Sequence, residues 1–384
     1  MSVKSRQLSH RTALVWDERY LWHHPGGGAG PLADGAALVE PGDFGEEGPH
    51  PRRRLRSLIE VSGLIDALVP VDARPASRAE LERAHTSEYV SRIRALSATG
   101  GGDAGDGTPF GPNGYDIAAL AAGGCIEAVD AVMDGRVDNA YALVKPPGHH
   151  ASCATGAGHC IFNNVAVAAR HAMATRGVER VTIVDWDVHW GNGTQEIFWV
   201  DPGVQFISLH QADWYPRGGG HAHEVGDGPG VGLNINVPLP PGSGIGAYRA
   251  AFERIIGPAL TAHRPQLILV SSGFDSGAND PTGRMLLTSQ DYHELTQFLL
   301  GAAQHHFDGR IVVCHEGGYS PTYTPFCGVA VIEALAGIAE PDRIKDPFLP
   351  RYTGVGYEQL QNHQSAAITE VLAHHPSLVQ TAFA

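Results

Sequence analysis

The sequence predicts an α/β protein in which a mostly parallel sheet lies between two layers of helices. Three observations lead to this prediction. Short apolar runs alternate with segments of helical periodicity along the 384 residues. Several runs are apolar on both faces, as in parallel strands buried between helices. No internal repeat or long linker divides the chain, so we assign residues 1–384 to a single domain.

The predicted strands are short and rich in β-branched residues. They comprise residues 11–16, 140–144, 181–186, 204–209, 233–237, 267–271 and 310–314. Segments with helical periodicity lie between or after them, at 51–62, 77–96, 115–133, 164–175, 246–262, 288–307 and 325–337. Glycine-rich stretches at 25–48, 100–114 and 218–232 separate predicted elements. We interpret them as long surface loops that frame a site, with flexible linkers as the alternative.

Composition excludes several classes of partner. The chain has 27 Lys and Arg against 41 Asp and Glu, a formal charge of −14. This balance argues against nucleic acid and anionic membranes as partners, because both require a cationic face. No apolar run approaches the roughly 18 residues of a membrane span, and the polar start lacks a secretory signal. The five cysteines form no CxxC pair, which favours the reducing cytoplasm.

The most informative segment is the strand at 181–186, which leads into Asp-x-Asp-x-His. Alternate side chains of an extended chain share a face, so Asp185, Asp187 and His189 can project together. At the carboxyl end of a parallel strand, such a face lines the crevice where α/β proteins bind ligands. Two carboxylates and an imidazole there suit a divalent metal. The alternative is an Asp-rich turn that caps the next helix.

Polar groups also follow other predicted strands. His149 and His150 are adjacent and suit proton transfer near neutral pH, although a surface pair without a role is the alternative. Asp275 and Tyr319 follow two further strands. By itself, Asp275 would be interpreted as a turn or helix-capping residue, and Tyr319 as a packed aromatic. Together, strand ends with complementary chemistry favour one active site.

The segments that carry a family resemblance span most of the chain, in order: PPGHH (146–150), CIFNNVAVAA (160–169), DWDVHWGNGTQ (185–195), ISLHQ (207–211), NVPLPPGSG (236–244), SGFDS (272–276) and EGGYSPTYTPFCGVA (316–330). They resemble the arginase–deacetylase superfamily, and within it the class II histone deacetylases, histone-deacetylase-like amidohydrolases and acetylpolyamine amidohydrolases. The resemblance implies the arginase–deacetylase fold, with a sheet of about eight strands. It also implies an enzyme, a zinc-dependent hydrolase of linear amides.

The resemblance assigns roles by position. It implies one zinc ion per chain held by Asp187, His189 and Asp275, where the metal would polarise the amide carbonyl and activate water. The other catalytic residues that it implies are the general base His150, its partner His149, their supports Asp185 and Asn192, and the oxyanion donor Tyr319. It implies structural potassium at two sites, one formed by Asp185, Asp187, His189, Ser208 and Leu209, and another by Phe198, Asp201 and Val204.

The substrate tunnel departs from the family pattern. The residues concerned are His159 and Tyr215 at positions that are usually Phe, Thr282 at a usual Leu or Met, and Trp190 at a usual second His. We also expect Gly158 and Gly317 to bind substrate. Asp103 is expected to do so as well, because it lies in a stretch that resembles a substrate-gripping loop of the family. Polar walls predict altered specificity. The alternatives are neutral drift, an inward-packed His159, or His159 as an additional metal ligand.

We predict hydrolysis of a small acetylated amine, such as an acetylpolyamine or acetyl-lysine. A close alternative is a short non-acetyl or xenobiotic N-alkyl amide. Ureohydrolase activity is disfavoured because that chemistry needs a two-manganese site with additional Asp ligands. A non-catalytic sensor of acylated ligands is the alternative from another class. The resemblance further implies a homodimer or homotetramer.

Overall fold

The structure is a computed structural model that describes residues 9–25, 47–306 and 309–381. Among these residues, the main sheet has eight parallel strands in the order β2-β1-β5-β10-β9-β6-β7-β8. The strands are β1 Thr12–Val15, β2 Leu68–Val71, β5 Asn139–Ala142, β6 Val181–Asp185, β7 Val204–Gln211, β8 Asn234–Leu239, β9 Leu267–Ser272 and β10 Ile311–His315. The predicted fold class is confirmed.

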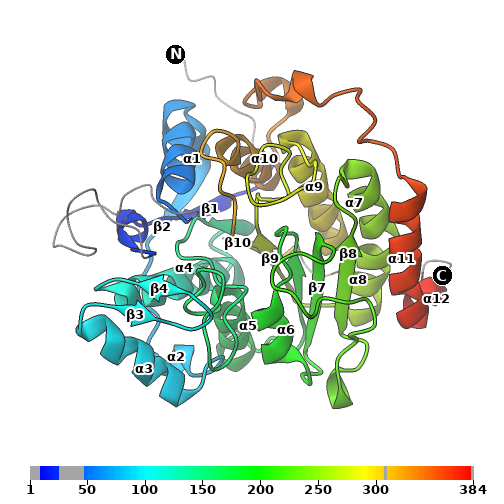
Figure 1. Ribbon diagram of the computed structural model, residues 1–384. Helices are drawn as coiled ribbons and strands as arrows, with labels where there is room; N and C mark the ends of the chain where they lie inside the picture. Colours follow the sequence, from blue (N-terminus) through cyan, green and yellow to red (C-terminus); the bar gives the residue numbers. More distant parts are fainter. Residues whose placement is uncertain (1–8, 26–46, 307–308, 382–384) are drawn as a thin grey trace.

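Helices cover both faces of this sheet (Figure 1). The first ones are α1 His50–Val61, α2 Arg78–Leu81, α3 Ser87–Ala98, α4 Gly114–Met133, α5 Asn164–Thr175 and α6 Asn192–Phe198. The later ones are α7 Ile245–Ala251, α8 Gly257–His263, α9 Ser289–His306, α10 Thr324–Ala336, α11 Asn362–His374 and α12 Pro376–Thr381. Alternate strand residues enter two cores: Val184 packs on the side of α1, α9 and α10, whereas Ile183 packs on the side of α4 and α5.

Some elements differ from the prediction. The predicted helix at 77–96 is divided into α2 and α3, because the side chain of Thr86 caps α3 by accepting from the Tyr89 N–H. A π-helical turn, Phe252–Ile256, interrupts the predicted helix at 246–262 between α7 and α8. The strand β2, a short hairpin of β3 Gly102–Asp103 and β4 Pro109–Phe110, and α6, α11 and α12 were not predicted. Most of the predicted 25–48 loop lies outside the described residues.

The sheet order explains where a site can form. The strands β5, β10, β9 and β6 are consecutive neighbours, and all are parallel. Their carboxyl ends therefore meet along one edge, where ligands bind in open α/β sheets. None of the helices in the described ranges has the length and apolar character needed to cross a bilayer. The assignment of all 384 residues to one domain stays a prediction.

Candidate active site

Four chain segments converge at the carboxyl edge of the sheet. The segment after β5 carries His149 and His150, and the segment after β6 carries Asp187 and His189. The segments after β9 and β10 contribute Asp275 and Tyr319, as well as Glu316. Every one of these residues except the partly exposed Tyr319 is buried. The sheet thus brings together the strand-end residues that the sequence singled out.

Asp187, His189 and Asp275 form a compact donor set. Their ligating atoms lie within 4.8 Å of one another. His189 Nδ1 lies 3.0 Å from Asp187 Oδ1 and 3.1 Å from Asp275 Oδ2. Backbone N–H groups fix the carboxylates: Val188 donates to Asp275 Oδ1 at 2.8 Å, and Gly317 donates to Asp187 Oδ2 at 2.9 Å. Two carboxylates and one imidazole at this spacing fit a divalent metal that keeps open positions.

The electrostatics of this donor set also favour a bound cation. Burial and the neighbouring Asp187 charge raise the pKa of Asp275 to about 8. Burial alone would lower the pKa of His189, yet hydrogen bonds with Asp187 and Asp275 raise it to about 10. The raised pKa of Asp275 reflects burial and repulsion by Asp187; a divalent ion would relieve this repulsion and would displace the protons of Asp275 and His189 when it binds.

His149 and His150 lie side by side with opposite electrostatic character. Their ring centroids are 4.0 Å apart. His149 Nδ1 lies 3.0 Å from Asp185 Oδ2, and His150 Nδ1 lies 2.7 Å from Asn192 Oδ1. Burial opposes charge on His149, but Asp187 and Asp185 raise its pKa well above the usual value. Burial and the charges of His149 and His189 lower the pKa of His150 well below its usual value. A neutral His150 can accept a proton.

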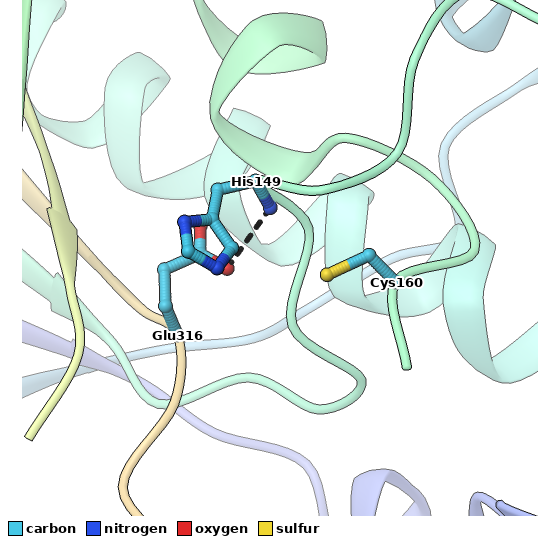
Figure 2. Close-up of side chains that lie close together, drawn as sticks. All are labelled: His149, Cys160 and Glu316. Carbon is cyan, nitrogen blue, oxygen red and sulfur yellow. Dashed lines mark hydrogen bonds between the residues drawn. The ribbon is translucent and has the colours of Figure 1, made fainter. Parts of the chain in front are cut away.

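Glu316 supports the site, although the sequence motif in which it lies did not by itself predict a role for it. Figure 2 shows its carboxylate beside His149, with Cys160 nearby. Glu316 Oε2 accepts from the N–H groups of Gly148 and His149 at 2.6 and 3.2 Å, and Ser271 Oγ donates to Oε1 at 3.1 Å. Burial raises the pKa of Glu316 to about 7. The carboxylate thus anchors the histidine loop to β9 and β10. Its position after a strand was the signal that could have revealed it.

Asp280 is a second residue that sequence reasoning missed. Its Oδ2 accepts from the N–H groups of Tyr319 and Ser320 at 2.6 and 3.1 Å. Its Oδ1 accepts from the N–H and hydroxyl of Thr282 at 2.9 and 2.7 Å. Burial raises the pKa of Tyr319 well above its usual value, so the phenol keeps its proton. Asp280 therefore positions a hydroxyl donor beside the donor set.

A cavity of about 490 Å³ opens onto these groups. The buried His150 and His189 and the partly exposed Tyr319 line it, and Asp106, Tyr215 and Arg284 are exposed residues of its lining. The Tyr215 ring lies edge-on to His150, at 5.1 Å between centroids. The His159 ring lies 6.4 Å from that of Tyr319. The cavity thus joins solvent to His150, His189 and Tyr319.

Four of the residues expected to bind substrate line the cavity: Gly158, His159, Tyr215 and Thr282. The Thr282 hydroxyl, however, donates to Asp280, so this side chain brings less polarity to the substrate than its identity suggested.

Three residues expected at the tunnel do not line this cavity, and their part in substrate binding stays a prediction. Asp103 does not line the cavity, because its carboxylate accepts from the N–H groups of Gly105 and Thr108 and so holds its own turn. Gly317 does not line it either. A Cβ there would lie 2.3 Å from Asp275 Oδ2, so this glycine leaves room for the carboxylates. Trp190 packs beside Gly219 and donates to Gln195, away from the cavity.

The residues expected at potassium sites lie on and beside β6 and β7. Asp185 pairs in register with Ser208, which precedes Leu209. In the second group, Asp201 is paired with Arg170, and its N–H donates to the Phe198 carbonyl at 3.0 Å. Val204 begins β7. Potassium at either position stays a prediction.

Comparisons with known proteins agree with this geometry. The histone deacetylase domain family matches residues 48–335. A histone deacetylase-like amidohydrolase from Pseudomonas aeruginosa is 48% identical over 341 residues, covering 88% of this chain and 89% of that protein. The human polyamine deacetylase HDAC10 is 37% identical over 315 residues, covering 79% of this chain and 46% of that protein. The crystal structure of the HDA15 HD domain matches with a TM-score of 0.83 and 32% identity, covering 97% and 98% of the two chains.

Proposed function

This chain belongs to the histone deacetylase domain family, and from that premise we propose that it is a zinc-dependent hydrolase of small acylated amines. Its relatives are named deacetylases and amidohydrolases, so it is an enzyme of the class that hydrolyses amides. The observation that carries the proposal is the convergence of Asp187, His189 and Asp275 beside His150, with His189 and His150 lining one cavity.

The three donors would hold the zinc ion through two carboxylates and one imidazole. When bound, zinc would polarise the amide carbonyl and lower the pKa of water at the site. Asp185 is not one of the three metal ligands, because its two oxygens accept hydrogen bonds from His149 and from the Asp187 N–H. It orients the neighbouring imidazole instead.

The proton chemistry falls to His150. With Nδ1 donating to Asn192, the other ring nitrogen is left to accept a proton from the attacking water. The same nitrogen then returns the proton to the leaving amine. His149, held by Asp185, supplies positive charge that keeps His150 neutral beforehand. Tyr319 donates its hydroxyl to the oxygen that becomes negatively charged.

The substrate belongs to the same proposal. An acetylated amine such as an acetylpolyamine or acetyl-lysine would reach the site through the cavity of about 490 Å³. His159 supports a second candidate, a short non-acetyl amide, because it places an imidazole in the cavity wall. Neither nucleic acid nor membrane is proposed as a partner for a chain of charge −14. We also propose a cytoplasmic homodimer or homotetramer with structural potassium.

The test is a panel of acetylpolyamines, acetyl-lysine and N-alkyl amides, assayed for amine release with and without a chelator. We expect chelator-sensitive release from at least one member. Release that persists after the bound metal has been removed would contradict the zinc requirement. A metal-loaded protein that binds a hydroxamate but hydrolyses no member would instead favour the acyl-ligand sensor.

A further inference from the structure

We propose that Arg284 forms a carboxylate subsite at the cavity mouth, so that the preferred substrate is a free Nε-acyl-lysine rather than an acylpolyamine. This inference rests on the amide hydrolysis proposed above and specifies its substrate. Arg284 is an exposed residue of the cavity lining. No role was assigned to it from the sequence.

The backbone and side chain of Arg284 are held in place. Its N–H donates to Gln211 Oε1 at 2.8 Å. Its Nη1 donates to the carbonyls of Pro281 and Gly283 at 3.0 and 2.6 Å. Within the described residues, Nε and Nη2 make no hydrogen bond, and no carboxylate pairs with the guanidinium. Donors therefore remain for an anionic ligand.

The Arg284 guanidinium lies over the ring of Trp214. The Arg284 Cζ atom lies 5.7 Å from the Trp214 ring centroid, within the range of a cation–π contact. Trp214 Nε1 donates to the Thr282 carbonyl at 2.9 Å, which ties the ring to the same loop. A stacked and anchored arginine loses little further side-chain freedom on binding a carboxylate.

A negative group lies beside the next aromatic residue. Tyr215 donates its hydroxyl to Asp106 Oδ2 at 3.3 Å, and Asp106 also lines the cavity. Within the described residues, Asp106 Oδ1 has no hydrogen-bond donor. Arg284, which lies over Trp214, and Asp106, which accepts from Tyr215, thus place a guanidinium and a carboxylate around one opening. This pair of charges is complementary in sign to the carboxylate and ammonium of an α-amino acid.

The charges separate the candidate substrates. An acylpolyamine offers only cationic groups, which Asp106 can bind but Arg284 repels. An internal acyl-lysine of a peptide has neither charge on its α-carbon. A free acyl-lysine carries both charges, and its side chain extends the acyl amide toward His150 and Tyr319. Paired rim charges typically change discrimination more than they change chemistry.

The experiment compares three substrates that share one reacting amide on the zinc-loaded enzyme. They are Nε-acetyl-L-lysine, N-acetylcadaverine, which keeps the ammonium but lacks the carboxylate, and N-pentylacetamide, which lacks both charged groups. We expect kcat/KM for acetyl-lysine to exceed that for the other two by about tenfold or more. The Arg284→Gln variant should bring the ratio of acetyl-lysine to acetylcadaverine to about one.

Controls separate this effect from general charge and from misfolding. Arg217 is exposed two residues after Tyr215 but does not line the cavity, so Arg217→Gln should keep the wild-type ratio. Asp106→Asn should lower the ratio of kcat/KM for acetylcadaverine to that for N-pentylacetamide. Arg284→Glu should invert the order in favour of acetylcadaverine, and thermal unfolding reports the fold of each variant.

Different outcomes overturn different statements. Equal kcat/KM for the three substrates, or a ratio that Arg284→Gln leaves unchanged, would overturn the subsite while amide hydrolysis stands. Hydrolysis of none of the three, nor of any amide in the wider panel, would remove the proposed function itself.

Discussion

The carboxylate of Asp280 holds the backbone of Tyr319 at the edge of the donor set. Asp280 Oδ2 accepts from the Tyr319 N–H at 2.6 Å, and the neighbouring Ser320 N–H donates to the same oxygen. Asp280 lies in the loop after β9, whereas Tyr319 follows β10. One buried carboxylate therefore links the loops of two adjacent strands and sets the position of the proposed hydroxyl donor.

Replacing Asp280 by Asn should lower kcat more than it raises KM. Asn retains one oxygen acceptor but introduces an amide facing N–H donors, so the Tyr319 loop should shift. We expect a loss in kcat of about 10- to 100-fold, the scale of a displaced oxyanion donor. Thr282→Val is the matched control, since it removes only a hydroxyl that donates to the other Asp280 oxygen. Unchanged kcat in Asp280→Asn would contradict this positioning role.

Removing a metal ligand should abolish metal binding and activity together. Asp275→Ala leaves one carboxylate and one imidazole, which is a poor site for zinc. We expect the metal content to fall from about one ion per chain to less than about a tenth, measured by elemental analysis after dialysis. Asp116→Asn, at an exposed aspartate of α4, is the charge-matched control. Full metal content in Asp275→Ala would refute the assigned donor set.

His150 and Asn192 should differ in the size of their effects. His150→Ala removes the proposed base, so kcat should fall by about 10²- to 10⁴-fold. Asn192→Ala removes only the acceptor at 2.7 Å that orients the ring, so the loss should be about 10-fold. The double variant should lose little more than His150→Ala alone, because the two residues act as a unit. The measurement is kcat of the three variants at equal metal content. If the losses of the two single variants add in the double variant, Asn192 does not act by orienting His150.

His159 should disfavour acetyl-lysine peptides. Its imidazole lies in the cavity wall where a Phe would present apolar surface to the lysine methylenes. His159→Phe should therefore increase kcat/KM for such peptides by about 3- to 10-fold, through the energy of an improved apolar contact. The measurement is a peptide assay of both proteins. Equal or better turnover by the wild type would show that His159 does not limit peptide binding.

The free energy of unfolding should fall in acid partly through Glu80. Hydrogen bonds from Arg74, opposed by burial and helped by Ser77, lower the pKa of Glu80 to about 2. A depressed carboxylate pKa contributes stability that is present above about pH 4.5 and is lost as the pH falls toward about 2. Glu80→Gln should flatten the stability profile in this window. Denaturant unfolding with chelator present measures it, with exposed Glu179→Gln as control; identical slopes would exclude Glu80 as a contributor.

Local patterns predicted the elements best where the chain is apolar on both faces. The strand that becomes β6 was placed within one residue of its observed Val181–Asp185 bounds. The edge strand β2 was missed because its Leu68–Val71 segment contains a proline and alternates between buried and exposed positions only weakly. The break between α2 and α3 was also missed, since a single hydroxyl at Thr86 restarts the helix inside a continuous helical pattern.

The sequence by itself determined the strand-end groups Asp187, His189, His150 and Tyr319, because consecutive parallel strands deliver whatever follows them to one edge of a sheet. Only the tertiary structure decided which residues support them. Asp280 reaches Tyr319 across 39 residues, and Glu316 reaches Gly148 across 168. It also decided that Arg284, not Asp103, faces the cavity. Motif spacing reports neighbours along the chain, whereas these contacts depend on how loops of separate strands pack against one another.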